Sequence, residues 1–187
     1  MPDVFIFHGT AGRPEGNWFP WLKNELEKLQ CKVTVPRFPT PEGQSLEAWL
    51  GVLNSYKRQI SGDTILVGHS LGGLFLLRVL ERLPNPVAAA FFVAAPIGVK
   101  PILYYEGDEK FSGFSFDWNE IRNKARRFFV YHSDNDPYVS LGNGKELAKH
   151  LGVPITFIAN AGHLNAESGY TRFDRLLADI RKILKNH

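Results

Sequence analysis

One serine of this chain stands in a pattern that suits nucleophilic catalysis. Ser70 lies at the centre of a G-x-S-x-G motif, with Gly68 two residues before it and Gly72 two residues after it. An apolar run at residues 64–67 precedes the motif and an apolar helical stretch follows it, which is the context of a nucleophile elbow. Such a turn strains the backbone at the serine and needs glycine where a Cβ would collide with neighbouring backbone. The pattern therefore predicts a serine hydroxyl that projects above the carboxyl edge of a sheet.

A serine hydroxyl is a weak nucleophile and needs a base that takes its proton. On folds with this turn the order along the chain is serine, then an acid, then histidine, with the last two on loops after later strands. His163 follows the apolar run at residues 155–158 and is therefore the predicted base. The other histidines suit packing, strand-end, helical or terminal positions: His8, His69, His132, His150 and His187.

The acid must lie between Ser70 and His163 in the chain. Asp136 follows the apolar run at residues 128–131, and Pro137 stiffens the turn that would present its carboxylate. We therefore predict Asp136 as the acid and keep Asp134 as the alternative. Asp134 also suits a loop-capping role, because aspartate side chains accept hydrogen bonds from backbone N–H groups in turns.

Acyl transfer also needs donors for an oxyanion. The N–H of Leu71 would open the helix after Ser70 and point, with the helix dipole, toward an oxyanion formed beside the serine. A second donor is expected from the glycine-rich bend after the first strand, where the N–H of Thr10 is the prediction and that of Ala11 the alternative.

Other chemistries fit the sequence less well. The motif lacks the Gly-Lys-Ser/Thr of a phosphate loop and no G-x-G-x-x-G follows a strand, which argues against nucleotide binding. A metal site could use His132, Asp134 and Asp136, but a further histidine or carboxylate at ligand spacing is missing and the calcium-loop pattern fails. We expect neither a metal nor a cofactor.

Alternating strand-like and helix-like segments must position these residues. Six apolar runs are typical of strands covered on both faces, and amphipathic stretches lie between them, which indicates an α/β domain with a mainly parallel sheet. Ser45, Asp117 and Thr171 are predicted to begin three of the helices. Residues 96–116 show no clear period and are predicted to form a long loop on the rim of the sheet. The predicted strands are residues 3–7, 32–35, 64–67, 88–93, 128–131 and 155–158.

The composition is that of an ordinary globular domain. The 187 residues are 44% apolar and 22% charged, enough to bury a core as one domain over residues 1–187. A net charge of +3 is a poor signal for nucleic acid binding. Cys31 is the only cysteine, which excludes an intrachain disulfide and suits a reducing compartment. The apolar stretches are too short for a signal peptide or a membrane helix, so we expect a cytoplasmic protein without membrane partners.

Five blocks of sequence stand in order along nearly the whole chain. They are His8-Gly9, Asn-Trp-Phe-Pro-Trp-Leu at residues 17–22, Gly-His-Ser-Leu-Gly-Gly at 68–73, Ser-Asp-Asn-Asp-Pro-Tyr-Val at 133–139 and Ala-Gly-His-Leu-Asn at 161–165. In these blocks the chain resembles the small serine hydrolases of the YdeN and retinoblastoma-binding-protein-nine type. The resemblance implies a compact α/β-hydrolase fold without a large lid, with Ser70 as nucleophile, Asp136 as acid and His163 as base.

One feature of that family is missing from this chain. The retinoblastoma-binding name refers to an L-x-C-x-E motif, whereas residues 29–33 are Leu-Gln-Cys-Lys-Val and lack the glutamate. We therefore do not expect a retinoblastoma-type partner.

These observations predict one α/β-hydrolase domain with a six-stranded, largely parallel sheet in the order 2-1-3-4-5-6, helices on both faces and its site at the carboxyl ends of the strands. The predicted function is serine hydrolysis of small carboxylic esters, with a small-molecule acyl substrate as the partner. A non-catalytic binding module on the same scaffold is the alternative, because a fold does not guarantee activity.

Aromatic residues are candidates for the substrate pocket, since such pockets are mostly apolar and aromatic. Trp18 suits either the pocket or the packing of the first helix, and His8 and Tyr138 are further candidates. The short chain leaves at most residues 96–116 to cover the site, so we expect an open, shallow pocket for small acyl substrates.

Overall fold

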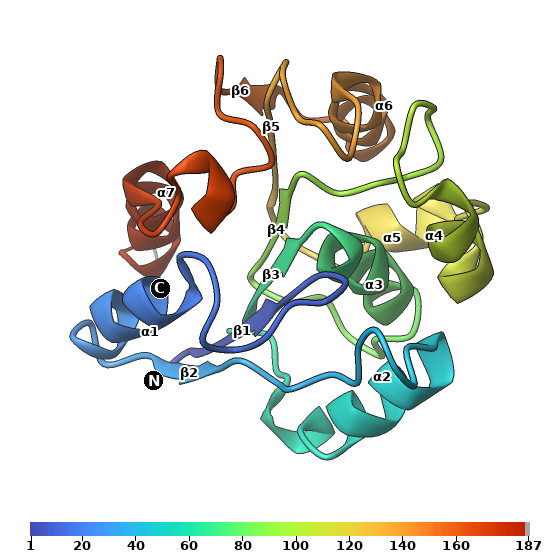
Figure 1. Ribbon diagram of the computed structural model, residues 1–187. Coiled ribbons are helices and arrows are strands. Elements are labelled where there is room, and N and C mark those ends of the chain that lie inside the picture. Colours follow the sequence, from blue (N-terminus) through green and yellow to red (C-terminus); the bar gives the residue numbers. More distant parts are fainter. Residues whose placement is uncertain (186–187) are drawn as a thin grey trace.

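A six-stranded parallel sheet forms the centre of the computed structural model, which describes residues 1–185 (Figure 1). Its strand order is β2-β1-β3-β4-β5-β6, and every neighbouring pair runs parallel. The predicted strand order and all six predicted strand segments are confirmed. The strands are β1 (Asp3–Phe7), β2 (Lys32–Thr34), β3 (Ile65–His69), β4 (Ala89–Val93), β5 (Phe128–His132) and β6 (Ile155–Phe157).

Helices cover both faces of this sheet, and the sheet separates two apolar clusters (Figure 1). Helices α1 (Phe19–Glu27) and α7 (Asp174–Leu184) pack on one face. On the other face lie α2 (Leu46–Asn54), α3 (Leu71–Leu80), α4 (Tyr105–Ser112), α5 (Trp118–Arg122) and α6 (Leu141–Leu151). Two short 3-10 helices are η1 (Lys57–Gln59) and η2 (Ala166–Ser168).

The continuous apolar runs of the strands follow from this two-sided cover. In β1, Val4 and Ile6 join the cluster under α1 and α7, whereas Phe5 and Phe7 join the cluster on the opposite face. Successive side chains of a strand point to opposite faces of a sheet, so both sets must be apolar when both faces are covered.

Two of the three predicted helix starts are observed. The Ser45 hydroxyl accepts a hydrogen bond from the N–H of Ala48 at the start of α2, and the Asp117 carboxylate accepts one from the N–H of Glu120 at the start of α5. The prediction for Thr171 is wrong, because α7 begins only at Asp174. Two residues separate Thr171 from this start. The second, Phe173, has non-helical backbone (φ −139°, ψ 73°) and a side chain that is 2% exposed, so burial of its ring accounts for the later start of the helix.

The prediction of a long loop at residues 96–116 is also wrong in part, since this segment contains α4. Only Asp108 and Phe111 of this helix are buried, and its sequence includes a glycine and four charged residues. So narrow a buried face leaves almost no apolar period in the sequence. None of the helices in residues 1–185 is long and apolar enough to cross a membrane.

Candidate active site

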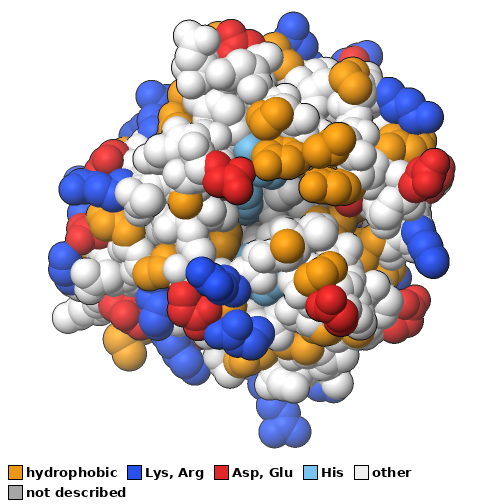
Figure 2. Space-filling view, in the orientation of Figure 1, with side chains coloured by type: hydrophobic (Ala, Val, Ile, Leu, Met, Phe, Trp, Pro, Cys, Tyr) orange, Lys and Arg blue, Asp and Glu red, His pale blue; other side chains and the backbone are white. Residues whose placement is uncertain are grey.

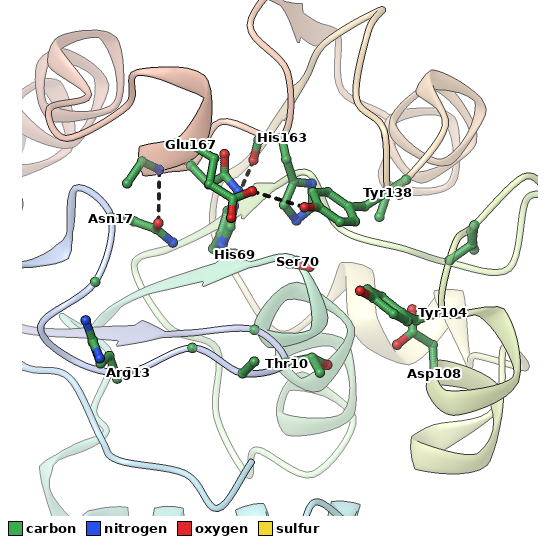
Figure 3. A pocket seen from close by; sticks show the side chains of 18 residues that line it. Thr10, Arg13, Asn17, His69, Ser70, Tyr104, Asp108, Tyr138, His163 and Glu167 are labelled. Atoms are coloured by element: carbon green, nitrogen blue, oxygen red, sulfur yellow. Dashed lines mark hydrogen bonds between the residues drawn. The ribbon is translucent and has the colours of Figure 1, made fainter. Parts of the chain in front are cut away.

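Ser70 lies at the sharp turn between β3 and α3, at the carboxyl edge of the sheet (Figure 3). Its backbone has φ 55° and ψ −127°, a combination that is strained for a residue with a Cβ. The flanking glycines make this turn possible: a Cβ on Gly68 would lie 2.5 Å from the carbonyl oxygen of Gly72, and a Cβ on Gly72 would overlap the carbonyl group of Phe7.

Asp136 and His163 meet on the loops that follow β5 and β6. The Asp136 Oδ2 atom lies 2.7 Å from His163 Nδ1, and the Asp136 side chain is fully buried. A carboxylate can only accept at this distance, so Nδ1 carries the proton and Nε2 is left free to act as a base. The other oxygen of Asp136 accepts hydrogen bonds from the N–H groups of Tyr138 (2.8 Å) and Val139 (3.0 Å).

These contacts keep the Asp136 carboxylate ionised. Burial by itself would raise its pKa, but the hydrogen bond and charge of His163 and the two N–H donors outweigh burial and hold the pKa below its usual value. An ionised acid beside Nδ1–H can stabilise the imidazolium that forms when the histidine takes a proton.

Asp134 faces a different group. It is exposed, and its Oδ1 accepts a hydrogen bond from the N–H of Asn160 at 2.8 Å. Its two neighbours make equivalent bonds: the Ser133 hydroxyl accepts from the N–H of Ala161 (2.9 Å) and the Asn135 amide oxygen from that of Gly162 (2.7 Å). Three consecutive side chains after β5 thus hold the three consecutive residues that precede the histidine. We call these three contacts the loop tie.

The loop tie was not foreseen from the sequence, because it depends on two loops that meet only in the folded sheet. The run Ser-Asp-Asn at residues 133–135 was a signal for turn-forming side chains, which accept hydrogen bonds from backbone N–H groups. Its partners on the other loop could not be identified without the pairing of β5 and β6.

Three further histidines are buried hydrogen-bonding residues. His69 Nε2 donates to the carbonyl oxygen of His163 at 2.9 Å, and its burial lowers its pKa to about 3, so it is neutral. His8 Nε2 accepts from the N–H of Phe38 at 3.1 Å. His132 Nε2 donates to the carbonyl oxygen of Val139 at 2.9 Å. Burial also lowers the pKa of His8 and His132.

Two backbone amides are the predicted oxyanion donors, those of Leu71 and Thr10. Leu71 is the first residue of α3, and N–H groups in the first turn of a helix have no acceptor within the helix. Thr10 is exposed and lines the same cavity as Ser70. The N–H of the alternative residue, Ala11, instead donates to the Thr40 hydroxyl at 2.8 Å.

A cavity of about 600 Å³ opens beside Thr10, Ser70 and His163. Figure 2 shows it as a hollow with histidine atoms within it and hydrophobic side chains along one side. Tyr138 lines the cavity, and its ring packs edge-on against the His163 ring at 4.9 Å. The segment 96–116 contributes Ile102, Tyr104 and Asp108 to its wall.

Two of the predicted pocket residues do not line this cavity. Trp18 is fully buried and donates its indole N–H to the carbonyl oxygen of Leu164 at 2.9 Å, so it packs under the loop that carries His163. His8 is also fully buried, and its ring packs against the stacked rings of Phe38 (5.3 Å) and Trp49 (5.6 Å). In residues 1–185, no three His, Cys, Asp or Glu side chains are grouped as ligands of one metal ion.

Comparisons with known proteins connect this geometry with a family. A family model described as serine hydrolase matches residues 4–182. The protein YdeN of Bacillus subtilis (strain 168) is 29% identical over 169 residues, which cover 90% of this chain and 89% of YdeN. The serine hydrolase RBBP9 of Rattus norvegicus is 23% identical over 178 residues, which cover 89% of this chain and 86% of that protein.

Solved structures share the whole architecture. The crystal structure of the ydeN gene product from B. subtilis has a TM-score of 0.90 at 28% identity, covering 99% of this chain and all of that one. The esterase domain of a Rhodothermus marinus protein has a TM-score of 0.65 at 22% identity, covering 96% of this chain and 86% of that one. The second likeness concerns the fold alone.

Proposed function

The chain belongs to the serine hydrolase family and has the α/β-hydrolase fold, and on this premise we propose that it hydrolyses small carboxylic esters through an acyl-enzyme on Ser70. The observation that carries the proposal is the buried contact of Asp136 with His163, which faces the same cavity as the strained serine. A cavity of about 600 Å³ suits a small-molecule substrate.

The proposed reaction has two halves. In the first, His163 Nε2 takes the proton of the Ser70 hydroxyl as its oxygen attacks the ester carbonyl, and the N–H groups of Leu71 and Thr10 stabilise the oxyanion. The imidazolium then returns the proton to the departing alcohol. In the second half, His163 activates a water that releases the acid and restores the serine. Asp136 orients the imidazole and stabilises its charged form throughout.

The choice of Thr10 as second donor is supported by the engagement of Ala11. The N–H of Ala11 already donates to the Thr40 hydroxyl, so it would have to break that bond to reach a substrate.

The single buried thiol, Cys31, suits the reducing cytoplasmic setting that we also propose for the protein.

A fluorophosphonate probe tests the nucleophile. We expect the protein to be labelled at Ser70, as identified by peptide mass spectrometry, and Ser70→Ala to take no label. We also expect Ser70→Ala to reduce p-nitrophenyl butyrate turnover by about 10⁴-fold or more. A folded wild-type protein that takes neither label nor ester would instead favour the binding-module alternative.

A further inference from the structure

One ionisable side chain of the cavity has no part in the chemistry described so far. Asp108 of α4 is only 6% exposed, yet it lines the same cavity as Ser70. Within residues 1–185 no cation or hydrogen-bond donor compensates its carboxyl group, and burial alone raises its pKa to about 7. An uncompensated carboxylate in such a place is costly for the fold, unless something that enters the cavity compensates it.

The position of Asp108 is determined by firm contacts of its helix. Phe111, one turn later in α4, packs edge-on against Trp49 at 5.0 Å. At the end of the helix the guanidinium of Arg78 donates to the carbonyl oxygens of Ser112 (2.6 Å) and Ser115 (2.9 Å). Because the core and α3 hold the helix, the carboxyl group remains directed at the cavity.

Aromatic rings line the same cavity as this carboxyl group. Tyr104 and Tyr138 both line the cavity, and their rings are stacked with centroids 6.2 Å apart. In Figure 3, Tyr104 and Asp108 lie on one side of Ser70, whereas Arg13 lies on the other. The α4 side of the cavity therefore combines a carboxylate with tyrosine faces and lacks the cation of the opposite side.

From this arrangement we infer that Asp108 is a specificity-determining residue that binds a positively charged ammonium group of the ester substrate. The inference deepens the proposed function and rests on it. A carboxylate and an aromatic face both attract a cation, and the attraction is stronger away from water. A neutral hydroxyl could donate a hydrogen bond to one oxygen, but it would leave the negative charge uncompensated. The charge of the buried group is what selects a cation.

Matched pairs of esters test this inference. The first pair is the p-nitrophenyl ester of γ-trimethylammonio-butyric acid and its uncharged isostere, in which carbon replaces the nitrogen. The second pair is the acetyl ester of choline and its carbon isostere, and their hydrolysis is measured by the acid that is released. The first pair places the cation on the acyl side and the second on the alcohol side. The quantity measured is the ratio of kcat/KM for the charged ester to that for the neutral one, at about pH 8.

We expect a ratio well above one for one of the pairs, and a fall of that ratio by about tenfold or more in Asp108→Asn. Glu106→Gln is the matched control, because it removes the same charge from an exposed position of the same helix. Its ratio should equal that of the wild type. A ratio that Asp108→Asn leaves unchanged in both pairs overturns the inference, even when the neutral esters are hydrolysed. If the wild type hydrolyses none of the four esters, the result counts against the proposed function instead.

Discussion

At the scale of single residues, two aspartates two positions apart have different surroundings. Asp136 is buried, carries three hydrogen bonds and faces His163. Asp134 is exposed and holds the N–H of Asn160. Residue type alone could not decide which aspartate faces the histidine, and Pro137 favoured Asp136 only indirectly. The surroundings assign Asp136 to the histidine and Asp134 to the adjacent loop.

Exchange of each aspartate for asparagine tests this assignment. Asp136→Asn is expected to lower kcat by about 10³-fold to 10⁴-fold, because an amide neither fixes the Nδ1–H form of His163 nor stabilises its imidazolium. Asp134→Asn keeps an oxygen that can accept the N–H of Asn160, so kcat should remain within about threefold of the wild type. Steady-state turnover of p-nitrophenyl butyrate measures both. Similar losses in the two variants would contradict the assignment.

Sequence reasoning proposed candidate site residues where the signal was local or depended on order along the chain. Ser70 has its glycines within two residues, and His163 stands on the loop that the order of a hydrolase requires. Asp108 could not be identified in this way, since nothing near it in the sequence shows that it faces Ser70. The place of Trp18 was ambiguous because an aromatic residue suits both a pocket wall and a core, and only the fold shows that Trp18 is fully buried.

At the scale of elements, the loop after β5 positions the loop after β6. The loop tie consists of side-chain acceptors at residues 133–135 and backbone donors at residues 160–162. The last of these contacts, from the N–H of Gly162 to Asn135, lies next to the proposed base. Asp136 and His163 therefore belong to loops that are fixed against each other by contacts outside the Asp136–His163 pair itself.

Asn135 tests the value of this tie. Asn135→Ala removes the acceptor of the Gly162 N–H, and we expect kcat to fall about tenfold with little change in KM, because small displacements of a catalytic group are costly. Asn135→Asp retains an acceptor oxygen at the same position and should recover most of the loss. Steady-state kinetics of the two variants, with circular dichroism to verify folding, provides the comparison. An alanine variant as active as the wild type would argue that the tie has no catalytic value.

The strands were predictable and some of the helices were not, for a physical reason. Cover on both faces makes each strand a continuous apolar run, which is visible in any short window of sequence. Helix α4 buries only two side chains and therefore has little periodic signal. The start of α7 depends on Phe173, whose ring must reach the core before the helix can begin. Tertiary burial outweighed local capping there.

At the scale of the whole molecule, helix α3 connects Ser70 with the wall of the cavity. Its first residue, Leu71, follows the serine, and Arg78 near its end holds the segment that contains α4. The same helix thus sets the position of Ser70 and that of Asp108. Within residues 1–185, the short helix α4 supplies part of the cavity wall because it is anchored to α3, the helix that follows Ser70.

The burial of Asp108 in this cavity wall is expected to lower the free energy of unfolding by an amount that depends on pH. The pKa of Asp108 is about 7 in the folded protein against an ordinary value of 3.8, because burial disfavours the charged form. Well below pH 4 the group is protonated in both the folded and the unfolded chain and has no effect on stability. As pH rises toward 7 the unfolded chain releases the proton first, so the free energy of unfolding falls by up to ~4 kcal/mol through this group and then levels off.

Asp108→Asn removes that dependence and is expected to stabilise the protein more at pH 8 than at pH 5. Urea denaturation at the two pH values measures the difference in unfolding free energy between variant and wild type. Glu106→Gln, at an exposed position of the same helix, should show almost no change at either pH. A gain for Asp108→Asn of the same size at both pH values would show that the carboxyl group is not strained by its burial. A gain that grows with pH, together with a loss of preference for cationic esters, is the combination expected of a residue kept for substrate recognition at the expense of stability.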